Sequence, residues 1–350
     1  MLLKDIYKPV EKQLIQIEDL LRNSLERSRR KSILEINNYM LVSPGKRLRP
    51  ALVALSSKAT SASNAPDREK QLIKIATSIE LIHMASLIHD DVIDHANLRH
   101  NKPTINTKFG EDISIALGDY LYSIAFQLVS RCGNMDILDC ISSAAKEMCE
   151  GELAQVCERD NISLLKKRYI LIIKKKTATL FAASCEAGAI ASGCPKEMRL
   201  SLRKYGLNFG IAFQIIDDCL DLVGKDIELG KLTGADFKMG ELTLPVLNLL
   251  SCSRDKKRVM SFLGQQNKES FQEIRNRFID SQAFLKTRGD ASSYLERSKK
   301  CLAGLEESCF KQSLSFLTDY MASRIICCME FQKFHTTVGG LGDCRQSPKG

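Results

Sequence analysis

The chain has 350 residues, of which 44% are hydrophobic and 27% are charged, proportions that are ordinary for a soluble globular protein. Glycine (20 residues) and proline (8 residues) are scarce, so the composition favours long helices and speaks against a strand-and-turn architecture. The net charge of +9 suits nucleic acid, an anionic membrane or a polyanionic substrate. The basic residues are scattered and do not alternate with aromatic residues, so we expect no nucleic-acid partner.

The first thirty residues distribute Lys, Arg, Asp and Glu among their apolar positions, so we expect no signal peptide. No run approaches eighteen apolar residues, and we therefore expect no transmembrane segment and a cytoplasmic location. The thirteen cysteines form no CxxC pair and no metal-finger spacing, which is typical of buried, reduced thiols.

Apolar residues recur at three- and four-residue spacing along most of the chain. This pattern predicts helices over residues 73–87, 137–148, 169–185, 198–223 and 314–331. The sequence has neither βαβ alternation nor a glycine-rich phosphate loop, so we expect an all-α fold with a single helical domain over residues 1–333. Residues 334–350 are polar and glycine-rich, and we expect them to form a disordered tail.

Two aspartate triplets with the same DDxxD spacing stand in or next to apolar helical stretches: Asp90, Asp91 and Asp94, and Asp217, Asp218 and Asp221. Residues four apart share a helix face, so Asp90 and Asp94 should point the same way. Buried carboxylates need a cation, and oxygen ligands without His or Cys suit Mg²⁺. One triplet alone would fit an exposed acidic helix end, which arises by chance in about one chain in ten of this length. Two triplets with the same spacing and apolar flanks favour a metal site.

Basic residues that suit a diphosphate stand in three separate parts of the chain. Lys46 and Arg49 lie near the N-terminus of an apolar helix, where unpaired N–H groups also favour phosphate. Arg99 follows the first triplet, and Lys176 stands with Thr177 in an apolar segment, where a lone charge needs a partner. Each of these alone is typical of a solvated surface. Together with the acidic triplets they describe a diphosphate held by Mg²⁺ on one side and by Lys and Arg on the other.

Over roughly residues 35–330 the sequence resembles the trans-polyprenyl diphosphate synthases. The stretches that carry the resemblance, in matching order and spacing, are GKRLRP (45–50), ELIHMASLIHDDVID (80–94), RHNKPT (99–104), GD (118–119), GELAQ (151–155), KTATL (176–180), FQIIDDCLD (213–221) and LGKLTGADFKMGELTLP (229–245). The resemblance implies a multi-helix bundle of the isoprenoid synthase type around a deep central cavity, in a homodimer. It also implies several Mg²⁺ ions per active site, with isopentenyl diphosphate and an allylic diphosphate as substrates.

The resemblance further implies a role for each matching residue. Asp90, Asp94 and Asp217 match direct Mg²⁺ ligands, whereas Asp91, Asp218 and Asp221 match residues that complete the cluster through water or by holding the ligands. The positions that bind isopentenyl diphosphate are Lys46, Arg49 and His83, and those that hold the allylic diphosphate are Arg99, Lys176, Thr177, Gln214 and Lys231. The implied reaction is ionisation of the allylic diphosphate, with Lys176 and the six aspartates as catalytic groups, followed by condensation and loss of a proton to pyrophosphate.

Two positions depart from the family pattern. His100 follows Arg99 where the family usually has a second Arg. A histidine is largely neutral at pH 7, so we expect weaker binding of isopentenyl diphosphate by His100, or higher activity in slightly acidic conditions. Glu241 stands where the family often has Lys, which removes a positive charge near the allylic diphosphate. We interpret both changes as tuning, although they also fit a less active or regulatory subunit.

The residues before the first triplet bear on product length. Ala85 and Ser86 lie one helical turn before Asp90, on the face expected to look down the tunnel in which the product grows. Small side chains leave that tunnel open, and Ala-Ser at this place resembles long-chain, octaprenyl-type synthases. The expected product is a long polyprenyl diphosphate for a quinone side chain, released with peripheral contact to a membrane. Ala85 and Ser86 are equally compatible with simple helix packing.

Two alternatives stay open at this stage, and two others fit the sequence poorly. A shorter-chain geranylgeranyl or farnesyl diphosphate synthase would carry the same motifs. A regulatory subunit of a heteromeric synthase typically loses acidic residues, whereas this chain keeps all six. A terpene cyclase would share the helical fold but should have a different second metal motif. A di-iron bundle would use Glu80 and His83 as an ExxH pair, but it needs a second pair that the other histidines do not provide.

Overall fold

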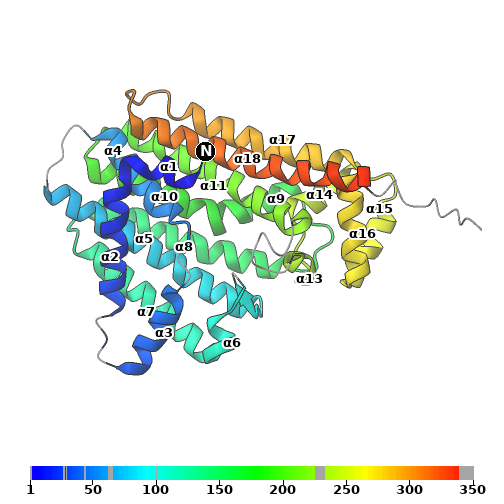
Figure 1. Cartoon of the computed structure of the whole chain (residues 1–350), viewed down its shortest axis with the longest axis horizontal. Helices are drawn as coiled ribbons and strands as arrows, with labels where there is room; N and C mark the ends of the chain where they lie inside the picture. Colours follow the sequence, from blue (N-terminus) through cyan, green and yellow to red (C-terminus); the bar gives the residue numbers. More distant parts are fainter. Residues whose placement is uncertain are drawn as a thin grey trace, which may run out of the picture.

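The computed structural model describes residues 2–26, 28, 30–42, 45–61, 66–99, 101–224 and 233–338; for residue 66 and residues 325–338 it describes the backbone alone. Within these ranges the regular structure is helical apart from one two-stranded antiparallel hairpin. The elements in chain order (Figure 1) are α1 (Leu3–Tyr7), the 3₁₀-helix η1 (Lys8–Val10), α2 (Glu11–Leu25), α3 (Lys31–Leu41), α4 (Leu48–Thr60), α5 (Pro66–Ile93), β1 (Leu98–Arg99), β2 (Lys102–Pro103), α6 (Ile105–Phe109), α7 (Glu111–Ser130), α8 (Met135–Cys157), α9 (Lys166–Ile173), the π-helix η2 (Lys174–Ala178), α10 (Thr179–Ser192), α11 (Lys196–Val223), α13 (Ala235–Lys238), α14 (Leu244–Cys252), α15 (Lys256–Gln265), α16 (Lys268–Ile279), α17 (Gln282–Lys300) and α18 (Cys309–Val338).

Helix α10 lies at the centre of the bundle. Every residue in it except Ile190 is buried, because nearly all of its side chains are small or apolar. It packs against α4, α5, α8 and α11. Phe181 belongs to one of two large core clusters and Leu180 to the other, so α10 joins them. A Cβ on Gly188 would lie 2.3 Å from the carbonyl oxygen of Val53 in α4, which explains why this close helix contact needs glycine.

The outer helices complete the bundle around this centre. Helices α17 and α18 run side by side along one edge, and α15 and α16 pair at one end of the molecule (Figure 1). Helix α17 also packs against α11, which carries the second aspartate triplet. Helix α11 thus packs against both α17 and the central helix α10.

The stretch predicted as one helix over residues 169–185 is a continuous helical run that changes pitch. Helix α9 passes into the five π-helical residues of η2, and α10 follows directly. Gly151 of α8 permits the close approach of η2, since a Cβ at that glycine would lie 2.3 Å from the backbone nitrogen of Lys176. Single π-turns occur frequently at functional sites, and this one carries both Lys176 and Thr177.

Both aspartate triplets stand where a 28-residue helix ends. Asp90 and Asp91 lie in the last turn of α5, and Asp94 follows immediately, with its N–H donating to the Asp90 carbonyl at 2.8 Å. The second triplet lies in the last turns of α11, which ends at Val223. After the first triplet the short hairpin pairs Arg99 with Lys102 and turns Arg99 back toward α5.

The predicted all-α fold is confirmed, and each of the five predicted helical stretches falls within helices. The boundary of the expected tail stays a prediction. The backbone of α18 continues to Val338, and residues 339–350 lie outside the described part of the chain.

Two helices are long and apolar enough, by length and composition alone, to cross a membrane: residues Asp67–Ile93 in α5, and α7. This differs from the expectation that the chain has no transmembrane segment. The most apolar stretch of α5 is 67% buried inside the fold, as is usual for the core helix of a bundle, whereas that of α7 is 39% buried. The two helices pack against each other. Packing therefore accounts for the composition of α5, while α7 keeps a partly uncovered face.

Candidate active site

Arg99 stands within electrostatic reach of both aspartate triplets. Its Nη2 and Nε atoms lie 2.8 and 3.0 Å from Oδ1 of Asp91, and Nε lies 3.1 Å from Oδ2. Although burial opposes it, the hydrogen bonds and charge of Asp91 raise the pKa of Arg99, and the charges of Asp90 and Asp217 act in the same direction. Asp90 and Asp91, in the last turn of α5, and Asp217, on α11, therefore all lie within electrostatic reach of Arg99.

Asp90 lies opposite the lysine of the π-helical turn. Lys176 Nζ forms an ion pair with Glu152 Oε2 at 2.5 Å and also faces Asp90. Burial raises the pKa of Asp90 to about 7, with the charge of Lys176 opposing the shift and that of Glu152 adding to it. A carboxyl group with this pKa ionises more completely when a further cation approaches.

The middle aspartate of the second triplet is held by two donors. The Tyr169 hydroxyl donates to Asp218 Oδ2 at 2.5 Å, and Gln214 Nε2 donates to Oδ1 at 2.7 Å. Burial raises the pKa of Asp218 to about 7, although these two hydrogen bonds lower it. Gln214 in turn accepts a hydrogen bond from Thr177 Oγ1 at 2.8 Å, which links the π-helical turn to α11. Asp221 Oδ2 accepts from the backbone N–H of Asp236 at 3.3 Å.

The residue before α4 has a structural role. Arg47 adopts a left-handed backbone conformation, with φ 50°, and its guanidinium is paired with two carboxylates. Nε lies 2.9 Å from Glu18 Oε2, and Nη1 lies 2.7 Å from Glu80 Oε1. The Glu80 side chain is only 4% exposed, so Arg47 neutralises a buried charge. This pairing also gives Glu80 a role other than metal binding.

The other basic residues near Arg47 have different surroundings from those of Arg47. Arg49 is buried, and its Cζ lies 4.2 Å from the ring centroid of Phe181. Its Nε has no hydrogen-bond partner among the described residues, and burial lowers the pKa of Arg49 to about 10. Burial and the charge of Arg49 lower the pKa of His83 well below its usual value, so His83 is neutral at pH 7. Partial burial lowers the pKa of Lys46, with the charge of Asp217 opposing the shift.

The last aspartate of the first triplet is held by a residue just beyond α8. Arg159 Nη2 lies 2.6 Å from Asp94 Oδ1, and Arg159 Nε lies 3.2 Å from Glu241 Oε1. Glu241 Oε2 accepts a hydrogen bond of 2.5 Å from Gln155 Nε2. Burial raises the pKa of Glu241, which the Gln155 hydrogen bond and the charge of Lys176 oppose.

The carboxylate oxygens of the candidate site suit Mg²⁺ as ligands. Across the described residues, no group of three or more His, Cys, Asp or Glu side chains is arranged to hold a metal ion by itself. Magnesium in proteins usually takes one or two carboxylates and completes its shell with water and substrate phosphates. Asp90 and Asp217, both within electrostatic reach of Arg99, offer carboxylate oxygens from two different helices. A divalent cation there would lower the raised pKa of Asp90.

The structure brings together most of the residues singled out from the sequence. His100 and Lys231 lie outside the described residues. Sequence reasoning missed Arg159, Glu152 and Tyr169 as partners of site residues. A buried lysine such as Lys176 requires an acidic partner, which is a signal for the Glu152 in GELAQ. The sequence held no comparable signal for Arg159, which lies 65 residues from its partner Asp94.

The two positions assigned to chain length lie inside the bundle. Ala85 has no exposed surface and belongs to the core cluster that contains residues of α5, α7 and α8. Ser86 is half-buried, and its hydroxyl donates to the His83 carbonyl at 2.9 Å. Their effect on product length stays a prediction.

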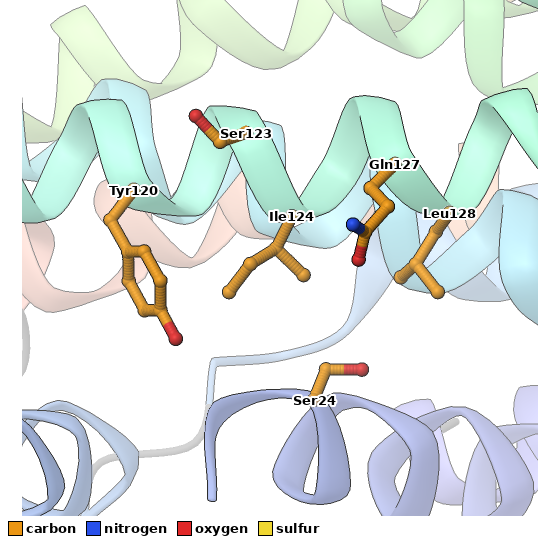
Figure 2. A pocket seen from close by; sticks show the side chains of 6 residues that line it. All are labelled: Ser24, Tyr120, Ser123, Ile124, Gln127 and Leu128. Carbon is orange, nitrogen blue, oxygen red and sulfur yellow. The ribbon is translucent and has the colours of Figure 1, made fainter. Parts of the chain in front are cut away.

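A separate groove of about 240 Å³ lies between α2 and α7. Figure 2 shows Tyr120, Ile124 and Leu128 of α7 pointing toward Ser24 of α2. None of its lining residues belongs to the acidic triplets or to the cations around them, so the groove is distinct from the candidate active site.

Fold and site together define the class of the protein as an all-α bundle of the isoprenoid synthase type. The chain resembles the crystal structure of a polyprenyl synthase from Caulobacter crescentus CB15 complexed with calcium and isoprenyl diphosphate. The two are 31% identical with a TM-score of 0.86, and the match covers 92% of this chain and 98% of the other.

Sequence comparison identifies the family. The chain matches the polyprenyl synthetase family over residues 30–278. It is 33% identical to heptaprenyl diphosphate synthase component 2 of Bacillus subtilis (strain 168), over 87% of each chain. It is 35% identical to octaprenyl diphosphate synthase of Escherichia coli (strain K12), over 62% of this chain and 66% of that protein. Geranylgeranyl diphosphate synthase of Methanosarcina mazei is 29% identical, over 93% of this chain and 99% of that protein. The chain belongs to the polyprenyl synthetase family and is a prenyltransferase.

Proposed function

We propose that this prenyltransferase condenses isopentenyl diphosphate with an allylic diphosphate, in a Mg²⁺-dependent reaction that builds a long all-trans polyprenyl diphosphate. The observation that carries the proposal is the electrostatic reach of Arg99 to Asp90, Asp91 and Asp217. Carboxylates on two helices, with a guanidinium within electrostatic reach of both, suit a diphosphate bound together with divalent cations.

Direct contacts to Mg²⁺ are assigned to Asp90, Asp94 and Asp217, and the supporting positions to the other three aspartates. The supporting role suits Asp91 and Asp218 because both oxygens of each accept hydrogen bonds from protein donors, and it suits Asp221 because its Oδ2 accepts from a backbone N–H. A carboxylate fixed in this way orients the ligands beside it or acts through water.

The cations divide between the two substrates. Isopentenyl diphosphate is assigned to Lys46, Arg49 and His83, since Arg49 is buried and keeps a free Nε donor among the described residues. Neutral His83 contributes a single N–H donor there. The allylic diphosphate is assigned to Arg99, Lys176, Thr177 and Gln214, and, outside the described residues, to Lys231; His100 is assigned to the isopentenyl side.

The reaction needs no nucleophilic side chain. Bound Mg²⁺ would neutralise the allylic diphosphate and make pyrophosphate a better leaving group. Lys176 and Arg99 hold the same group while its C–O bond breaks and both electrons leave with pyrophosphate. The double bond of isopentenyl diphosphate then supplies the electrons of the new C–C bond. A proton is lost to pyrophosphate and a double bond reforms. Asp90 and Lys176 are partly buried, so their charges act more strongly here than they would in bulk water.

A long product is supported by the small, interior Ala85 and by the likeness to heptaprenyl and octaprenyl synthases. The likeness to a geranylgeranyl synthase keeps a shorter product as the second candidate. Incubation of the purified chain with radiolabelled isopentenyl diphosphate, farnesyl diphosphate and Mg²⁺, followed by sizing of the products, tests both. Absence of any labelled product longer than the primer, both for the chain alone and after a partner subunit is added, would contradict the whole proposal.

A partner subunit is the other open point. The name of the Bacillus relative, component 2, describes one part of a larger enzyme. The six retained aspartates favour a catalytic chain, so we expect condensation by the purified protein alone. If activity appeared only after a second protein was added, the chain would be the catalytic half of a heteromeric synthase.

We also propose a homodimer that uses the uncovered face of α7. This helix is apolar, yet only 39% of its most apolar stretch is buried, and Ile115 on it is 48% exposed. Ile115→Lys should shift the dimer toward monomer in sedimentation velocity. Leu285→Lys, on α17 and 50% exposed, is the matched control and should leave the mass unchanged. Equal masses for the two variants would contradict this interface.

The proposed location is the cytoplasm, with contact to a membrane surface when the product leaves. A long polyprenyl chain is apolar throughout, so its release into water would be costly. The proposed fate of the product is a quinone side chain. Co-sedimentation of the enzyme with lipid vesicles, with and without turnover, measures the expected contact.

A further inference from the structure

Three segments that are distant in the sequence meet at the guanidinium of Arg159. Besides its bonds to Asp94 and Glu241, Nη1 lies 3.4 Å from the carbonyl oxygen of Ile93, the last residue of α5. The Arg159 side chain is 18% exposed and that of Glu241 is 12% exposed. This ion pair is therefore largely shielded from water, and its geometry is better defined than that of a surface pair.

The backbone reinforces the same junction. Asp160 N donates to the Gly240 carbonyl at 3.0 Å, next to Glu241. A Cβ on Gly240, whose φ is +71°, would lie 2.1 Å from Asp160 Oδ1. The turn after α8 and the loop before α14 are thus fixed to each other, and Arg159 projects from this junction to the end of α5.

Asp94 needs such support. It follows the last residue of α5, and its side chain is 34% exposed, so no helix backbone or dense packing fixes its rotamer. Among the described residues, Arg159 is the only side chain that hydrogen-bonds the Asp94 carboxylate. That bond engages Oδ1 and leaves Oδ2 for another ligand.

We propose that Arg159 is a positioning residue for Asp94, and that Glu241 and Gln155 hold Arg159 in place. The inference rests on the proposed function, in which Asp94 contacts Mg²⁺. Fixing the carboxylate before the cation arrives lowers the entropy cost of binding. Residues that orient metal ligands typically contribute about 10- to 100-fold to metal affinity.

The first test removes the guanidinium. Arg159→Gln should raise the Mg²⁺ concentration for half-maximal activity about tenfold. It should weaken Mn²⁺ binding, measured by EPR in the presence of inorganic pyrophosphate, by a similar factor. Arg159→Lys should recover part of the loss, since one ammonium cannot engage Asp94 and Glu241 as a guanidinium does. Arg168→Gln is the matched control, because Arg168 pairs with Glu158 on the same segment and is 45% exposed.

The second test separates positioning from simple structural support. Glu241→Gln should weaken metal binding in the wild-type background and have no further effect beside Arg159→Gln. The swapped pair, Arg159→Glu with Glu241→Lys, restores an ion pair between the two segments but places a negative charge against Asp94. The swapped pair should therefore regain the melting temperature that Glu241→Lys alone loses, but it should not regain Mn²⁺ binding.

Unchanged Mn²⁺ binding in Arg159→Gln, or full recovery of Mn²⁺ binding in the swapped pair, would overturn the inference. Failure of the proposed function is distinguishable from this outcome. It would appear as a lack of condensation by the wild-type enzyme, whereas Mn²⁺ binding is measured without any turnover.

Discussion

Lys176 on the π-helical turn and Glu152 on α8 form an ion pair of 2.5 Å, and the same ammonium faces Asp90 at the end of α5. The pair exists because Gly151 lets the π-turn approach α8 closely. One lysine thereby balances a neighbouring glutamate and places its charge within electrostatic reach of Asp90. That relationship makes Lys176 the most direct test of the candidate active site.

Lys176→Met should reduce kcat by about 100-fold or more, because it removes a cation that stabilises charge developing on pyrophosphate in a buried site. Steady-state kinetics with farnesyl diphosphate measures the effect. Lys174→Met is the control, since Lys174 lies two residues away on the same turn and is exposed. Equal losses in the two variants would argue against a specific role for Lys176.

Asp90→Ala should abolish condensation while leaving the helical circular dichroism spectrum unchanged, because Asp90 is assigned as a metal ligand and makes no contact that helix α5 needs. Product formation is measured with labelled isopentenyl diphosphate. Retained turnover would remove Asp90 from the metal site.

The pH dependence of stability gives a test without substrate. Burial raises the pKa of Asp90 from 3.8 to about 7, so between those values the folded protein holds a proton that the unfolded chain has released. The free energy of unfolding contributed by Asp90 therefore falls as the pH rises from about 4 to about 7, and stays low above that.

In metal-free buffer, Asp90→Asn should become more stable relative to wild type as the pH rises from 5 to 8. Urea unfolding of both proteins at several pH values measures this difference. The lowered pKa of His83 gives the free energy of unfolding an opposite pH dependence, which is the same in both proteins and cancels in the difference. A difference between the two proteins that does not change with pH would show that Asp90 ionises normally.

The same substitution should lower stability at Arg47 and weaken substrate binding at Arg49. Arg47→Met leaves the buried carboxylate of Glu80 without its ion-pair partner, so it should lower the free energy of unfolding by about 3–5 kcal/mol. Arg49→Met removes a buried guanidinium with an unbonded Nε among the described residues. It should cost little stability but raise KM for isopentenyl diphosphate about tenfold or more. Thermal unfolding and kinetics on both variants check the contrast, and a reversed pattern would exchange the two roles.

Ala85→Tyr should shorten the longest product, because a bulky ring at this interior position would fill the path assigned to the growing chain. Ala85 is fully buried, so the substitution should also destabilise the fold by about 1–3 kcal/mol. Chromatographic sizing of products, with thermal unfolding as the check on folding, measures both effects. An unchanged product from a folded variant would refute the tunnel assignment.

The sequence alone determined the helical class and the acidic composition of the site. Heptad-like apolar spacing specifies helices locally, and two DDxxD triplets on apolar stretches require cations wherever the helices pack. The pairing of those charges was decided only by the tertiary structure. Asp94 meets Arg159 from 65 positions away, and Asp218 meets Tyr169 from 49, and no local rule selects such partners.

Tertiary packing also decided which of several similar residues face the site. Arg47 and Arg49 are two positions apart with the same chemistry, yet a left-handed backbone turn at Arg47 pairs that side chain with Glu80, while Arg49 lies over Phe181. Likewise the apolar period predicted a helix through residues 169–185, but the π-turn that turns Lys176 toward Glu152 depends on α8 approaching at Gly151. Apolar periodicity depends on neighbours three or four residues away, whereas a long-range ion pair depends on how whole helices pack.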